Sequence, residues 1–169
     1  MKRTQNGEQL TRLARGGLIA ALYVVLTYLS SIFGLSSGVI QCRLSEALTI
    51  LPVFMPEAIP AVTVGCFLSN IFAGGEPLDI IFGTLATLIG AVGCYLLRGA
   101  AKKFPAIATL PTVLANAIII PFVLIFAYTA GEGYFFLFLT VGAGEIISAT
   151  VFGTILYYSL VKTKVFSIE

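Results

Sequence analysis

Histidine and tryptophan are both absent from this chain of 169 residues, and charged residues make up only 11% of it. Without histidine, the chain lacks the side chain that most often shuttles protons at neutral pH or binds metals. A soluble domain carries roughly a quarter charged residues, whereas 58% of this chain is hydrophobic. So few charges cannot cover a water-exposed surface, and the composition predicts an all-α integral membrane protein.

Motifs for catalysis and nucleotide binding are also missing. Cys42, Cys66 and Cys94 have no spacing typical of metal or redox sites, so we interpret them as small apolar side chains. The chain has no G-x-x-x-x-G-K-[ST] phosphate-binding loop and no paired nucleophile and base. We therefore expect no catalytic residue, no metal and no cofactor, and any ATPase that drives this protein must be a separate chain.

Apolar stretches fill most of the chain. At roughly 20 residues per transmembrane helix, this length suits about five or six segments in one domain and leaves no room for a separate soluble domain. Helical spacing of Leu10, Leu13 and Gly17 predicts that the first helix begins before the membrane does. The segments are expected at about residues 14–33, 44–55, 57–72, 78–97, 106–130 and 135–161.

The stretch Leu44–Phe72 decides between five and six segments. Its length fits one long helix, but three prolines interrupt it, and proline breaks helices. Cytoplasmic loops carry the excess of Lys and Arg. Two short segments with an inner turn at Pro52–Pro56 place nine of the ten basic residues in the cytoplasm, with Arg43 as the exception. We therefore predict six transmembrane helices in a multi-pass cell membrane protein, with both termini on the cytoplasmic side of a bacterial membrane.

The first half of this stretch is too short to span a bilayer unaided. Leu44–Phe54 would form ~16 Å of α-helix against a hydrocarbon core of ~30 Å. Short segments interrupted by proline are among the better sequence pointers to the binding site of a transporter. The stretch therefore favours a transport or ligand site.

Polar residues gather toward the outer half of the membrane in this topology. Ionisable residues at membrane depth are costly, so each is by default a candidate functional residue. Several acids and one base cannot all pair internally, which suits a ligand with hydrogen-bond donors and a positive charge. The predicted substrate-binding residues are Arg43, Glu46, Asn70, Asp79 and Glu145. As alternatives, Arg43 and Glu46 could form a helical ion pair, and Asp79 could cap the helix that it begins.

The first helix carries small residues four apart, in the pairs Gly16/Ala20 and Gly17/Ala21. This spacing lets another helix approach closely. Packing inside the protein and docking of an external partner both explain it.

Three sequence blocks resemble a known family: Gln41–Pro52 (QCRLSEALTILP), Pro56–Pro60 (PEAIP) and Leu78–Leu88 (LDIIFGTLATL). Over nearly its whole length the chain resembles the QueT family, the queuosine-precursor substrate-binding subunits (S components) of energy-coupling factor (ECF) transporters. The resemblance implies a six-helix S-component fold and a ligand pocket closed by the loop after the first helix. It also implies docking through the small residues of that helix on a transmembrane coupling subunit with two cytoplasmic ATPases.

The ligand implied by the resemblance is a 7-deazaguanine base, such as prequeuosine base or queuine, taken up from outside; nucleic acid is not an expected partner. One carboxylate can accept the adjacent ring N–H and amine donors, and a second can hold an added ammonium group. Glu145, Glu46 and Asp79 are the candidates, with Asn70 for ring acceptors. Two other classes stay open: a stand-alone secondary transporter for a small cationic or nucleobase-like solute, and a non-transporting membrane protein such as an assembly factor.

Overall fold

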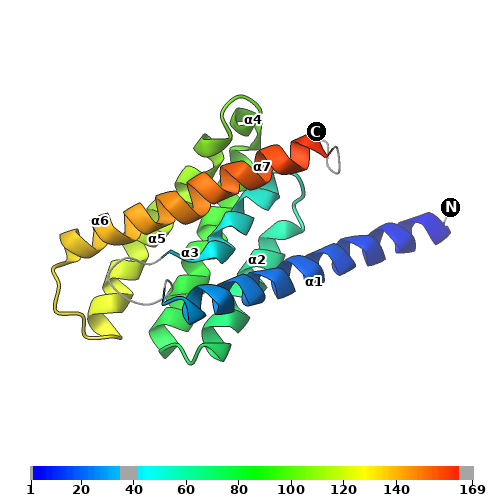
Figure 1. Ribbon diagram of the computed structural model, residues 1–169. Coiled ribbons are helices and arrows are strands. Elements are labelled where there is room, and N and C mark those ends of the chain that lie inside the picture. The colour runs from blue at the N-terminus through cyan, green and yellow to red at the C-terminus, as the bar shows by residue number, and fades with distance from the viewer. Residues whose placement is uncertain (1, 35–41, 164–169) are drawn as a thin grey trace.

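The computed structural model describes residues 2–34 and 42–163, with side chains described from residue 7. This part of the chain contains helices and no strand, as predicted. In chain order the elements are α1 (Lys2–Ile32), η1 (Leu44–Val53), α2 (Ala58–Phe72), α3 (Pro77–Leu96), α4 (Arg98–Ala101), α5 (Pro105–Phe126), α6 (Tyr134–Glu145), η2 (Ile146–Phe152) and α7 (Gly153–Lys162) (Figure 1).

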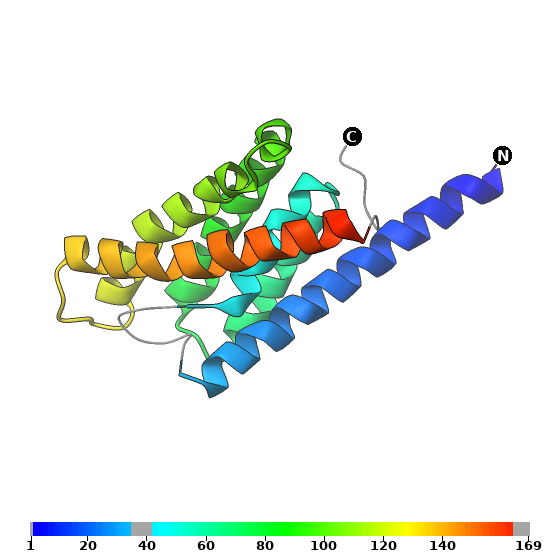
Figure 2. The same cartoon turned by 45° about the horizontal axis from the view of Figure 1, so that its top comes forward.

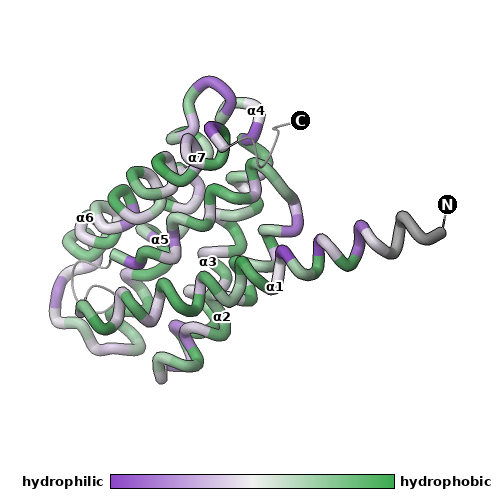
Figure 3. Tube along the Cα trace, turned by 45° about the vertical axis from the view of Figure 1, so that its right-hand side comes forward, coloured by the Kyte–Doolittle hydropathy of each residue, from purple (hydrophilic) through white to green (hydrophobic). Residues whose placement is uncertain are grey.

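Four helical stretches are long and apolar enough to cross a membrane, and η1 and α2 are shorter apolar helices. Large apolar side chains such as Leu18, Phe67 and Ile118 lie exposed on the outside of the bundle, where lipid is the natural solvent. Most residues along the chain are hydrophobic, and the hydrophilic residues lie mainly in the first half of α1 and in the turns (Figure 3). The protein is therefore a multi-pass, all-α membrane protein. The four long stretches are Gly7–Ile32, Pro77–Leu96, Pro105–Phe126 and Tyr134–Lys162.

The first half of α1 projects beyond the rest of the bundle (Figures 1 and 2). The helix has 31 residues, a length of about 46 Å at 1.5 Å per residue. That length exceeds a hydrocarbon core of about 30 Å. We therefore expect the polar first turns to extend out of the apolar layer, in line with the prediction from their sequence spacing.

Two separate elements occupy the stretch Leu44–Phe72, with a turn at residues 54–57 between η1 and α2. The first of them is a 3₁₀ helix of ten residues, where an α-helix was expected. A proline inside an α-helix clashes with the carbonyl four residues earlier, and Pro52 lies inside η1. The 3₁₀ form also rises about 2.0 Å per residue, so η1 reaches about 20 Å.

The element η1 lies at the centre of the bundle. It contacts α1, α2, α3, α5, α7 and η2, and every residue from Ser45 to Val53 is buried. Surrounding helices therefore cover an element too short to cross the membrane by itself. Any polar side chain on η1, Glu46 above all, faces protein.

The later helices differ from the expected ranges in two places. The last segment is interrupted by the π-helical η2 directly after Glu145, and π-helical turns occur frequently at functional sites. The helix α5 ends at Phe126, four residues before the expected end at 130, because Ala127–Ala130 leave the helix and Thr129 takes a left-handed conformation (φ 51°). Elsewhere, the short α4 was not predicted.

Glycines let α3 and α5 pack closely. A Cβ placed on Gly90 would lie 2.6 Å from Oγ1 and 2.7 Å from Cα of Thr112, and one on Gly93 would lie 2.4 Å from Cβ of Pro111. Contacts this close are possible only without a side chain. The α3–α5 pair therefore forms a tight seam beside η1.

The two ends of the bundle differ in charge. The start of α1, the turn at residues 54–57, α4 and the end of α7 lie at one end, and the turns at residues 73–76 and 127–133 lie at the other (Figures 1 and 2). Basic residues are concentrated in the cytoplasmic loops of membrane proteins, which supports the predicted cytoplasmic placement of the first end. At this first end of the bundle, the basic residues whose side chains are described are Arg12, Arg15, Arg98, Lys102, Lys103 and Lys162.

Candidate functional site

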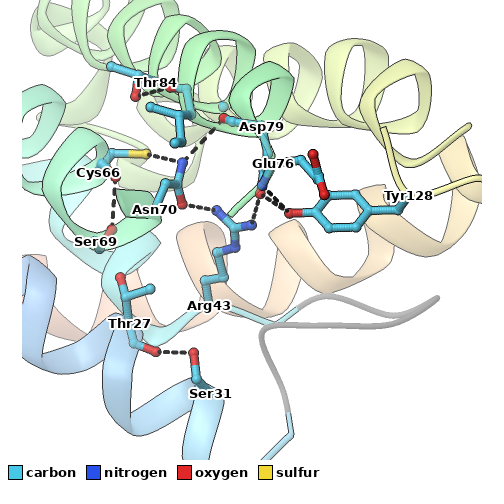
Figure 4. Close-up of polar contacts among 12 residues, drawn as sticks. Thr27, Ser31, Arg43, Cys66, Ser69, Asn70, Glu76, Asp79, Thr84 and Tyr128 are labelled. Carbon is cyan, nitrogen blue, oxygen red and sulfur yellow. Dashed lines mark hydrogen bonds and ion pairs between the residues drawn. The ribbon is translucent and has the colours of Figure 1, made fainter. Parts of the chain in front are cut away.

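Arg43 joins the start of η1 to α2 and α3. Its backbone is extended (φ −92°, ψ 109°) at the residue before the first turn of η1. Its Nη1 donates a hydrogen bond to Oδ1 of Asn70 at 3.4 Å, and its Nη2 lies 3.7 Å from Oδ2 of Asp79 (Figure 4). The two charged side chains are only 12% and 9% exposed. Three of the five predicted site residues are thus in mutual contact.

Asp79 and Asn70 are held by further hydrogen bonds. The Asn70 amide donates to the backbone oxygen of Asp79 at 3.3 Å and contacts Sγ of Cys66 at 3.7 Å. Asp79 was also a candidate helix cap, but its carboxylate contacts Arg43 and Tyr128. The N-cap position of α3 belongs to Glu76, whose side chain makes no capping bond.

Tyr128, in the turn between α5 and α6, completes this cluster. Its hydroxyl donates to Oδ2 of Asp79 at 3.1 Å and accepts a hydrogen bond from the backbone N–H of Glu76 at 3.2 Å (Figure 4). Partial burial raises the pKa of Tyr128 above its usual value, and the nearby Asp79 charge raises it further. The phenol therefore stays protonated and remains a donor at neutral pH.

A cavity of about 760 Å³ opens beside these residues. Its volume falls within the range of about 300–1,000 Å³ that is typical of small-molecule sites. Arg43, Asn70 and Asp79 line it, whereas Glu46 and Glu145 are not among its lining residues. Its other lining residues include hydroxyl groups from α1, α2 and the α5–α6 turn, together with apolar side chains: Thr27, Tyr28, Ser31, Ser69, Tyr128, Val24, Val25, Leu29 and Phe72.

Glu46 lies on η1 and is 2% exposed. The hydroxyl of Tyr23, from α1, donates a hydrogen bond to its Oε1. Its Oε2 is buried and has no hydrogen-bond partner among the residues that the structure describes. The alternative ion pair between Arg43 and Glu46 is wrong for the described chain, because Arg43 pairs with Asp79.

Glu145, the last residue of α6, is 4% exposed. Within residues 2–34 and 42–163 its buried Oε2 finds no hydrogen-bond partner. It lies close enough to Glu46, Arg43 and Cys42 to interact with them electrostatically. The elements η1 and η2 pack together, and Ser148 on η2 donates to Sγ of Cys42 at 3.2 Å. Glu46 thus lies on η1, and Glu145 lies directly before η2, which packs against η1.

Sequence reasoning missed both tyrosines of the site. Tyr23 belongs to a buried stripe of α1, together with Ile19, Thr27 and Ser30. These residues have helical spacing. The polar residues among them are a sequence signal from which a polar site on this face of α1 could have been predicted. Tyr128 lies in a turn, where no helical periodicity of the sequence could identify it as a site residue.

A profile of the family described as QueT transporter matches residues 13–162. The chain belongs to the QueT transporter family. This QueT-family chain is 43% identical over 72 residues to the protein named Queuosine precursor transporter QueT of Lactococcus lactis subsp. cremoris (strain MG1363). The aligned residues make up 43% of this chain and 42% of that relative, so the match spans less than half of its length. No solved structure matches the chain.

The small residues of α1 divide between two faces in this family member. A Cβ on Gly16 would lie 3.9 Å from Cβ of Ala61, and one on Gly65 would lie 3.0 Å from the backbone oxygen of Ala20. Gly16 and Ala20 therefore face α2, within the protein. Gly17 and Ala21 are exposed on the outer surface of α1.

The predicted lid of the pocket, the loop after the first helix, falls in residues 35–41 and lies outside the described residues. The described residues on either side of it are Gly34, in the turn after α1, and Cys42, next to Arg43 in the chain.

Proposed function

We propose that this QueT-family chain is the membrane-embedded S component of an ECF-type importer. It binds a queuosine precursor, a 7-deazaguanine base such as prequeuosine base or queuine, from outside and delivers it inward. The observation that carries this proposal is a set of four charged side chains and one amide that lie buried or nearly buried inside a mostly apolar membrane bundle, in a chain of this family. That set consists of Arg43, Glu46, Asn70, Asp79 and Glu145.

The chemistry of these residues suits a deazaguanine. Its ring N–H and exocyclic amine are adjacent donors that a carboxylate accepts in a bidentate manner. Its carbonyl and ring nitrogen acceptors need donors, which the Arg43 guanidinium supplies. The Asn70 amide already donates to the backbone oxygen of Asp79 and contacts Sγ of Cys66. The cavity beside Arg43 is about 760 Å³, and aromatic side chains of Tyr28 and Tyr128 line it, which suits a flat heterocycle.

Uptake against a gradient requires an energy source outside this chain, because its sequence has no phosphate-binding loop. In the proposed mechanism the loaded S component docks on a transmembrane coupling subunit, and two cytoplasmic ATPases drive release of the ligand inward. The exposed pair Gly17 and Ala21 offers the close approach that a docking helix needs.

The second candidate function is a stand-alone secondary transporter for a small cationic or nucleobase-like solute. The unpartnered carboxylate oxygens of Glu46 and Glu145 within the described chain favour it, because buried acids in transporters also serve as ion sites.

Mass spectrometry of the small molecule that co-purifies with the protein tests the ligand, and titration calorimetry with 7-deazaguanine bases tests its affinity. We expect a deazaguanine to be recovered and to bind with a micromolar or lower Kd. Recovery of an unrelated molecule, or no binding of any deazaguanine by folded protein, contradicts the proposal.

Proteoliposomes separate the two functions. Uptake that needs a coupling subunit, two ATPases and ATP supports the S component. Uptake by this chain alone, driven by a sodium or proton gradient, supports the secondary transporter instead.

A further inference from the structure

The connection between α3 and α5 carries three basic residues and no acid. Its sequence from Leu96 to Phe104 is LLRGAAKKF, and the basic residues are Arg98, Lys102 and Lys103. It lies at the end of the bundle that the basic residues assign to the cytoplasm, and Figure 3 shows hydrophilic residues beside α4. This corner is therefore separate from the ligand cavity, which lies beside the start of α3 at the other end of the bundle.

A buried alanine anchors the short helix α4 at this corner. Ala101 is fully buried and belongs to a cluster with Cys94 of α3 and Tyr157 of α7. The helix α4 has only four residues, and Lys102 and Lys103, which follow directly, are exposed. The two lysines are thus presented from a backbone that the core fixes in place.

Two aromatic rings lie next to the basic groups. The guanidinium carbon of Arg98 is 4.2 Å from the ring centroid of Tyr95, and its Nη1 donates to the backbone oxygen of Tyr95 at 3.1 Å. Nζ of Lys103 is 5.6 Å from the ring centroid of Phe104. Tyrosine is enriched at the interface between membrane and water, so we place this corner at the depth of the lipid headgroups.

The three cations have no acidic partner. No ion pair joins Arg98, Lys102 or Lys103 to a carboxylate in the part of the chain that the structure describes. Leu96 and Phe104, which flank the connection, are 70% and 55% exposed. A cationic corner beside exposed apolar side chains complements a molecule with an anionic head and an apolar tail.

We propose that Arg98, Lys102 and Lys103 bind the phosphate headgroup of an anionic phospholipid in the cytoplasmic leaflet. The negative surface of that leaflet attracts basic residues near it by about fivefold in affinity for each Lys or Arg. The planar guanidinium of Arg98 matches two phosphate oxygens, and the lysines act as point charges. Leu96 and Phe104 contact the acyl chains. This inference goes beyond the proposed function and does not depend on it.

Native mass spectrometry of the full chain in detergent micelles tests the site. The chain is titrated with phosphatidylglycerol and, separately, with phosphatidylcholine of the same acyl chains. We expect the wild type to bind the first phosphatidylglycerol more tightly by on the order of 100-fold, because three cations contribute about fivefold each. Lys102→Gln/Lys103→Gln should lose about 25-fold of that affinity. Both lysines are exposed, so the double variant should keep the wild-type melting temperature.

Two further variants separate a built site from diffuse attraction. Arg12→Gln/Lys162→Gln removes the same charge from exposed positions of α1 and α7 and should bind phosphatidylglycerol as the wild type does. Arg98→Lys keeps the charge but loses the forked contact, so it should bind about tenfold more weakly. Equal losses in the two double variants, or unchanged binding in Arg98→Lys, would show that only the net charge of this end acts and would overturn the proposal.

The titration also distinguishes a lipid from other occupants. Glycerol 3-phosphate carries the phosphate without acyl chains and should not displace the bound phosphatidylglycerol. If it binds as tightly as the lipid, the corner is a site for a soluble phosphate ester, and the proposal is overturned. If Lys102→Gln/Lys103→Gln keeps its lipid and instead loses a co-purifying protein subunit, the corner is a protein-docking surface, which overturns the proposal as well.

Discussion

Tyr23 on α1 donates the hydrogen of its hydroxyl to Oε1 of Glu46 on η1, and the two side chains are 1% and 2% exposed. This contact links the helix that carries the small residues proposed for docking to an acid of the candidate site. Gly65 on α2 makes room for it, because a Cβ there would lie 2.7 Å from Cβ of Tyr23.

Replacing Tyr23 tests this link. Tyr23→Phe keeps the ring in place and leaves Oε1 of Glu46 without its donor, which should cost about 1–3 kcal/mol of stability. A thermal unfolding experiment in detergent measures the change. Tyr158→Phe, at an exposed tyrosine on α7, is the matched control and should unfold like the wild type. Equal melting temperatures for all three proteins would show that the Tyr23 hydroxyl contributes nothing.

Replacing Arg43 tests the cavity cluster. Arg43→Lys keeps the charge, but a single ammonium cannot reproduce the forked contact with Asn70 and Asp79. We expect about tenfold weaker ligand binding, a loss of about 1.4 kcal/mol, measured by titration calorimetry. Arg12→Lys, at an exposed position of α1, should bind like the wild type. If Arg43→Lys also binds like the wild type, Arg43 is not part of the site.

The seam between α3 and α5 gives a prediction about packing. Gly90→Ala places a methyl group 2.7 Å from Cα of Thr112, so backbone must move, at a cost of about 1–3 kcal/mol. The gain of up to about 1 kcal/mol in helix propensity offsets only part of that cost. Gly99→Ala, where nothing lies within 4 Å of the added Cβ, should unfold at the wild-type temperature or above. The same lowering of the melting temperature in both variants would refute the steric explanation.

Cysteine labelling tests the orientation in the membrane. In a chain whose Cys42, Cys66 and Cys94 are replaced by serine, one new cysteine is placed at Glu132 or at Lys102, both exposed. Because basic residues are retained on the cytoplasmic side, a membrane-impermeant maleimide should label Glu132→Cys in intact cells. It should label Lys102→Cys only after the cells are permeabilised. The reverse pattern would invert the topology.

The two faces of α1 give a prediction about docking, which rests on the proposed function. Gly17→Leu adds bulk to the exposed face, so it should reduce co-purification of the coupling subunit and leave the melting temperature unchanged. Gly65→Ala should separate α1 from α2, because its Cβ would lie 2.7 Å from Cβ of Tyr23, and should lower the melting temperature. If Gly17→Leu still co-purifies a full complement of coupling subunit, the exposed face is not the docking surface.

Composition, proline positions and basic residues were enough to predict a helical membrane protein in which Leu44–Phe72 forms two elements. They also singled out Arg43, Asn70 and Asp79, which the structure brings into contact. These properties can be predicted from sequence because each depends on a residue and its near neighbours. A run of apolar side chains favours lipid whatever the rest of the fold, and a proline disrupts the helical turn in which it lies.

The tertiary structure decided which side chains meet. Arg43 pairs with Asp79 rather than with Glu46, its neighbour three residues on. Its backbone is extended before the first turn of η1 (φ −92°, ψ 109°), so helical spacing does not bring the two side chains together. Tyr23 and Tyr128 enter the site from α1 and from the α5–α6 turn. Such pairings depend on how closely helices distant in sequence pack, as at Gly65 and Gly90, and no local pattern in the sequence encodes that distance.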